Sequence, residues 1–163
     1  VENANLVWQR ANIAMDSLGA KSEVRDAFRA LKAYLSQVSG LANLRFSALD
    51  ATTVVTADDG QGVGAGTAKL YGIFLKKKAT AVDAFVSVVD NGTDDNYYGG
   101  ALTGSVRIQA AFLGSSDQFH AVFPAGLAIA NGIRVVSTTA AAAGTTASAA
   151  ADAVDGFIIS GSA

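Results

Sequence analysis

The strongest constraint on the fold is a run of alternating residues between positions 105 and 137, SVRIQAAFLGSSDQFHAVFPAGLAIANGIRVVS. Apolar residues occupy every second position in several short segments, for example at Val106, Ile108 and Phe112. A side-chain period of two is typical of a β-strand with one buried face. Turn-forming residues interrupt the runs at 114–116, 124–126 and 131–132. Short alternating strands joined by tight turns predict an antiparallel sandwich or barrel.

The same pattern predicts further strands on both sides of this stretch. Glycine-rich residues 60–66 and small residues 138–151 are predicted to be long connections between strands. The last strand is predicted to carry Phe157 and Ile159 on one face. Seven of the eight phenylalanines follow residue 45, so the main core is expected in the β region. The further predicted strands are 44–48, 52–56, 69–75, 82–88 and 154–160.

Two helices are predicted ahead of the strands. Apolar residues spaced by three and four predict a helix from about Asn5 to Leu18, which Gly19 ends. Ser22 is a suitable N-cap for a second helix, whose apolar residues step by four and three in turn. The first stripe consists of Trp8, Ala11, Met15 and Leu18, with Leu6 and Ile13 beside it; the second consists of Val24, Phe28, Leu31, Leu35 and Val38.

The second helix requires a partner surface. Burial of five apolar side chains contributes roughly 10 kcal/mol. Ordering its residues costs on the order of 17–34 kcal/mol before hydrogen bonds are credited. The helix must therefore lie on the first helix, on its own sheet or on a neighbouring subunit. If it lies on the first helix or on its own sheet, its apolar stripe is not available to bind another chain. If a neighbouring subunit is the partner, the candidate protein-interaction residues are the second stripe (Val24, Phe28, Leu31, Leu35 and Val38), Trp8 and the loop residues Tyr97 and Tyr98.

The predicted fold class is α+β. A helical arm or anchor is expected over residues 1–41, and an antiparallel β-sandwich, jelly-roll-like or barrel-like, over residues 42–163.

Residues with catalytic or ligand-binding chemistry are scarce. The chain has no cysteine and one histidine, which disfavours thiolate chemistry and the common zinc sites. His120 has no neighbouring Ser or Asp of triad character, so a structural or solvent-facing role is expected. Residues 60–66 lack the Lys and the following helix of a phosphate loop. The acidic loop 90–96 is an alternative calcium site, although Asn91-Gly92 favours an ordinary hairpin turn. We expect no enzyme activity, no cofactor and no metal.

The charge content bears on partners. Only 16% of residues are charged, against about 25% in typical globular proteins. A surface this poor in charge is expected to be partly covered by other protein chains. The net charge of −2 and the sparse basic residues predict no nucleic-acid partner, and no apolar run reaches the length of a membrane span.

Residues 67–160 resemble small β-sandwich virion proteins of tailed bacteriophages. The resemblance lies in LYGIFLKKK, the following acidic Gly/Asp loop and the run FPAGLAIANGIRVVST. Within that run the matching positions are Phe123, Gly126, Leu127, Ile129, Gly132, Ile133 and Val135.

The resemblance implies a non-enzymatic role in the virion, assembled after synthesis in the bacterial cytoplasm. A capsid decoration protein that binds the major capsid protein as a homo-oligomer, a trimer in first place, is the leading hypothesis. The alternatives are a fibre, adaptor or tail component, and a carbohydrate-binding β-sandwich in which Tyr97, Tyr98 and the loop 90–95 face a ligand.

Overall fold

The computed structural model describes residues 4–37, 44–49, 67–77, 84–90, 105–112, 118–138 and 154–162. Within these ranges two helices precede seven strands, in the order that the sequence predicts. The helices are α1 (Ala4–Leu18) and α2 (Ser22–Gln37). The strands are β1 (Arg45–Leu49), β2 (Ala68–Lys77), β3 (Ala84–Asp90), β4 (Ser105–Phe112), β5 (Gln118–Ile129), β6 (Ile133–Thr138) and β7 (Val154–Ser162).

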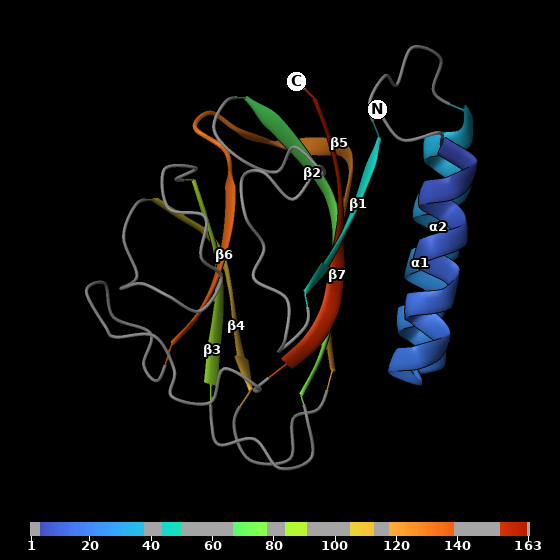
Figure 1. The fold of residues 1–163 in the computed structure, drawn as a ribbon, viewed down its shortest axis with the longest axis horizontal. Coiled ribbons are helices and arrows are strands. Elements are labelled where there is room, and N and C mark those ends of the chain that lie inside the picture. The colour runs from blue at the N-terminus through green and yellow to red at the C-terminus, as the bar shows by residue number, and fades with distance from the viewer. Residues whose placement is uncertain are drawn as a thin grey trace.

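The described strands form two antiparallel sheets. One sheet has the order β1-β7-β2-β5 and the other the order β4-β3-β6. Both helices lie against one side of the four-stranded sheet, and the three-stranded sheet lies on its other side (Figure 1). The chain is therefore an α+β fold of three layers, with a helical pair packed on an antiparallel sandwich, which confirms the predicted fold class.

Two hydrophobic cores lie between the three layers. The core between the sheets contains Ile73 of β2, and the core between the helices and the sheet contains the next residue, Phe74. In β7, Phe157 and Ile159 face the helices while Ile158 faces the second sheet, so the predicted pairing of Phe157 with Ile159 is confirmed. The central strands are buried on both faces, because each face meets a different layer.

The predicted stripe of α1 is confirmed. Trp8, Ala11, Met15 and Leu18 are buried against the sheet, together with Val7. Leu6 and Ile13, which flank that stripe in the sequence, are exposed. Gly19 follows the helix with φ of +59°, the left-handed conformation that commonly ends helices.

The predicted turn at residues 124–126 is wrong, because β5 continues through it. β5 pairs with β2 through Val122 opposite Gly72 and Leu127 opposite Leu70, so β5 advances five residues where β2 advances two. The extra residues form a bulge in which Gly126 has φ of +83°. Among the described strands β5 is the last in its sheet, so the missing N–H of Pro124 removes no hydrogen bond between them. The turn predicted at Asn131-Gly132 is present between β5 and β6, with Gly132 at φ of +104°.

Several predicted features lie outside the described residues. These are the strand at 52–56, the glycine-rich segment 60–66, the domain boundary at residue 41 and most of the segment 138–151.

Candidate functional site

The predicted protein-interaction residues are mostly interior to the chain. Relative exposure is 7% for Trp8, 5% for Val24, 4% for Phe28, 1% for Leu31 and 4% for Leu35. All five belong to the core between the helices and the four-stranded sheet. The apolar stripe of the second helix is called the α2 seam below; it consists of Val24, Phe28, Leu31, Leu35 and Val38. Its four described residues cover the chain's own sheet, which is one of the three alternatives expected, and these side chains are not exposed for contact with another chain. Val38, Tyr97 and Tyr98 lie outside the described residues.

Phe28 is the centre of an aromatic cluster that joins the helices to the sheet. Its ring meets those of Trp8, Phe74 and Phe157 edge-on, at centroid distances of 6.0, 5.6 and 6.1 Å. Phe74 and Phe157 stack on each other at 5.0 Å with an interplanar angle of 25°. Edge-to-face and offset-stacked rings are the favoured arrangements of aromatic pairs. The cluster fixes α2 over β2 and β7.

A glycine in β2 allows this close approach. A Cβ atom added to Gly72 would lie 2.8 Å from Leu31 Cδ2 and 2.9 Å from Phe74 Cε2. Real Cβ atoms do not approach other carbon atoms so closely. The side chain of Leu31 therefore packs into the space left by the missing side chain of Gly72.

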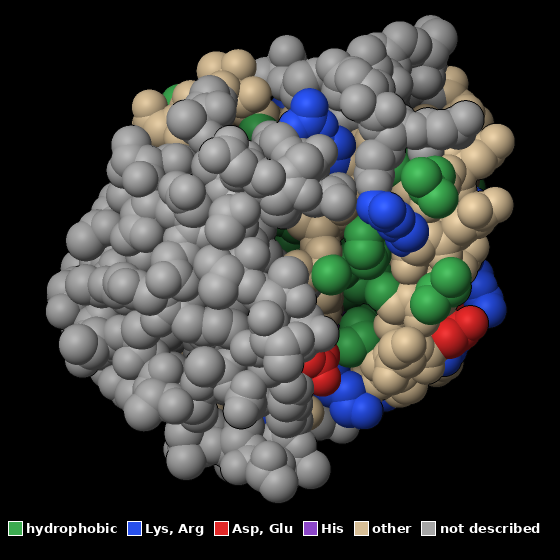
Figure 2. Space-filling model, in the orientation of Figure 1, with side chains coloured by type: hydrophobic (Ala, Val, Ile, Leu, Met, Phe, Trp, Pro, Cys, Tyr) green, Lys and Arg blue, Asp and Glu red, His purple; other side chains and the backbone are tan. Residues whose placement is uncertain are grey.

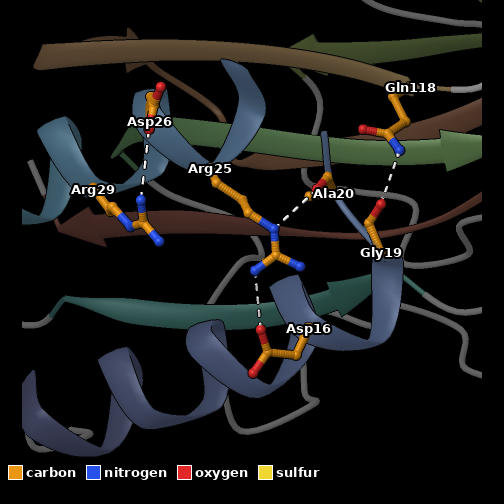
Figure 3. Close-up of polar contacts among 7 residues, drawn as sticks. All are labelled: Asp16, Gly19, Ala20, Arg25, Asp26, Arg29 and Gln118. Atoms are coloured by element: carbon orange, nitrogen blue, oxygen red, sulfur yellow. Dashed lines mark hydrogen bonds and ion pairs between the residues drawn. The ribbon is translucent and has the colours of Figure 1, made fainter. Parts of the chain in front are cut away.

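Polar contacts fasten the turn between the helices to the edge of the sheet (Figure 3). Gln118 of β5 accepts a hydrogen bond from Lys21 N at 2.9 Å and donates one to Gly19 O at 3.3 Å. Arg25 donates to Ala20 O at 2.9 Å and to Asp16 Oδ1 at 3.1 Å, and the latter contact is also an ion pair. No sequence pattern indicated a role for Gln118, because its partners are 97 and 99 positions away.

Asp90, a candidate calcium ligand in the sequence, is used by a turn instead. Its Oδ2 accepts a hydrogen bond from Ala130 N at 3.0 Å and its Oδ1 accepts one from Asn131 N at 2.7 Å. The bond from Ala130 is the main reason why the pKa of the Asp90 carboxyl is lowered. Both oxygens therefore hold the connection between β5 and β6. Asp94, Asp95 and Asn96 lie outside the described residues.

The other titratable candidates are dispersed. His120 is half-buried on β5 opposite Phe74 of β2, two residues from Gln118. Tyr71 is buried beneath the helices, and this burial raises the pKa of its phenol. Within the described ranges no three side chains of His, Cys, Asp or Glu come together as a metal site would require.

Large hydrophobic side chains are exposed at four described positions. Ile13 is 68% exposed and Leu6 is 41% exposed on α1, Tyr34 is 48% exposed on α2, and Val106 is 43% exposed on β4. Figure 2 shows hydrophobic, basic and acidic side chains interspersed on the half of this face where α1 and β1 lie. The outer surface of the helical layer is therefore the candidate interaction surface. Its signal in the sequence was the seven-residue spacing of Leu6 and Ile13 beside the buried stripe.

Neither α1, with 15 residues, nor α2, with 16, is long and apolar enough to cross a membrane. Comparisons with protein-family models, curated proteins and solved structures found no significant match. The functional argument therefore depends on the residues of this chain.

Proposed function

We propose that this chain is a non-enzymatic structural protein of a bacteriophage virion, which decorates and stabilises the capsid by binding major capsid protein subunits as an oligomer. The observation that carries the proposal is the shortage of charge, 16% of residues, in a fold that also exposes Ile13, Tyr34 and Val106. A surface of this kind is stabilised when it is buried against another protein surface. When the same modest contact is repeated over a symmetric shell, its stabilising free energy adds up over all copies.

The packing of the helices limits how such a protein would dock. The α2 seam is occupied by β2 and β7, so the contact with the capsid would use the outer faces of the helices or the second sheet. In a fibre or adaptor whose helices form a projecting stem, the α2 seam would be needed for contacts between the helices of different copies. The arrangement therefore favours decoration over the stem, and the virion assignment itself comes from the sequence resemblance.

Co-assembly tests the proposal. The chain would be co-expressed with the major capsid protein encoded in the same genome, and purified shells would be analysed by quantitative mass spectrometry. A copy number comparable to that of the capsid protein is expected for decoration. A far smaller number, seen only in complete virions, would indicate a tail or fibre component. Absence from both shells and virions would refute a structural role in the particle.

The docking face can be mapped in the same assay. Tyr34→Asp places a charge on the helical layer, and Val106→Asp places the same charge on the second sheet. Release of the protein from shells by one variant and not by the other identifies the face that binds, and each variant is the control for the other.

A further inference from the structure

We propose that α1 pairs antiparallel with α1 of a second copy of this chain, about a two-fold axis that passes at Ile13. This inference goes beyond the proposed function and does not depend on it, because the contact requires only this chain.

The centre of the proposed contact is apolar. Ile13 has the largest exposed fraction, 68%, among the large hydrophobic side chains of the described residues. Leu6 lies two helical turns earlier on the same side of α1 and is 41% exposed. Ala11 and Met15 face the sheet from the opposite side of the helix, so the packing of the monomer leaves Ile13 and Leu6 on the outside.

The charges beside Ile13 complement themselves under two-fold symmetry. Arg10 lies three residues before Ile13 and Asp16 three residues after it. In an antiparallel pair centred on Ile13, residues equally far before and after that position face each other. Arg10 of each copy therefore faces Asp16 of the other, and the contact occurs twice. A parallel pair would instead oppose Arg10 to Arg10.

The acidic member of each pair is accessible. The Asp16 side chain is 76% exposed although its Oδ1 already accepts a hydrogen bond from Arg25 Nη1 at 3.1 Å. The carboxylate therefore remains open to a second cation from another molecule. Gln9 and Ser17, the next pair of facing positions, are both exposed and uncharged, so nothing at these positions opposes the approach.

The proposed contact predicts a reversible dimer. One face of a 15-residue helix is smaller than the roughly 800 Å² that each partner of a standard interface buries. Exposed ion pairs add little affinity and mainly determine orientation. A contact with two-fold symmetry produces a dimer, whereas the sequence led us to expect a trimer. The molecular mass of the assembly distinguishes these two possibilities.

Sedimentation equilibrium of the purified full chain, from about 1 µM to about 1 mM, tests the dimer. Ile13→Asp is expected to raise the dissociation constant at least about thirtyfold, because it removes apolar burial from both copies and opposes two charges. Tyr34→Asp, an exposed hydrophobic-to-acidic change on the other helix, is the matched control and leaves the constant unchanged. Circular dichroism confirms that each variant is folded.

A charge exchange tests the antiparallel register. Arg10→Asp and Asp16→Arg are each expected to weaken self-association, because like charges then face each other. A mixture of the two variants restores both opposite-charge pairs, and its dimer is expected to be about tenfold or more tighter than that of either variant alone. A wild-type chain that is monomeric over the whole range, an oligomer that Ile13→Asp leaves intact, or a mixture no tighter than its components would overturn the proposal.

Discussion

Replacing Phe28 by Ala tests whether the helices belong to the interior of the monomer. Phe28 is 4% exposed and touches three other rings, those of Trp8, Phe74 and Phe157. Truncation of a buried Phe costs about 3–5 kcal/mol. The upper part of that range is expected, because the cavity would open between two layers and three edge-on ring contacts would be lost. A typical domain has only about 5–15 kcal/mol of stability in total.

Urea denaturation followed by far-UV circular dichroism measures this loss. Tyr34→Ala is the matched control, because Tyr34 is 48% exposed on the same helix and its truncation is expected to change the free energy of unfolding by about 0.5 kcal/mol or less. Fluorescence of Trp8, the single tryptophan of the chain, reports separately on the helical layer. A loss below about 1 kcal/mol for Phe28→Ala, or a loss that appears only at concentrations where the chain is oligomeric, would refute the intramolecular packing argument.

Two further predictions concern residues of the described strands. Asp90→Ala is expected to cost about 0.5–1.5 kcal/mol at neutral pH, because two solvent-exposed hydrogen bonds from the N–H groups of Ala130 and Asn131 are exchanged for bonds to water. The bonds from these two N–H groups lower the pKa of Asp90, so the stabilisation is complete above the unfolded pKa of about 3.9 and is lost as the pH falls through the lower folded pKa. Urea midpoints of the two proteins should therefore converge in acid, and an equal gap at pH 7 and below the folded pKa would contradict this reasoning. Gly156→Ala should destabilise the chain more than Gly72→Ala, whose overpacking cost is about 1–3 kcal/mol, because the new methyl group at 156 meets the rigid backbone oxygen of Phe74 and the one at 72 meets a side-chain end. Thermal melting compares the two variants, and the reverse order would contradict the contact geometry.

Local periodicity was sufficient to predict most of the elements. The α2 seam and the Phe157–Ile159 face were predicted because helix and strand side chains repeat with fixed periods, whatever they pack against. Periodicity does not say what covers a face, so the same residues fitted the chain's own sheet or a neighbouring subunit. The contacts of Phe28 with Phe74 and Phe157 decide this, and they join residues far apart in the sequence.

The bulge in β5 shows where local signals mislead. Pro124 and Gly126 are turn-forming residues, and local propensity alone favours a chain reversal. Pairing of the flanking residues Val122 and Leu127 with β2 keeps the strand continuous, so tertiary contacts override the propensity. The hydrogen bonds of Gln118 to the interhelical turn could not be predicted either, because a half-buried glutamine in a strand belongs to no pattern that indicates its partner.

The four-stranded sheet lies between two hydrophobic cores that are packed independently of each other. Because neighbouring residues such as Ile73 and Phe74 belong to different cores, a cavity created by a substitution in the core beneath the helices leaves the packing between the two sheets in place. We therefore expect the helical layer to detach as a unit while the described strands stay paired, so that backbone amides of α1 and α2 exchange with solvent at lower denaturant than those of β3.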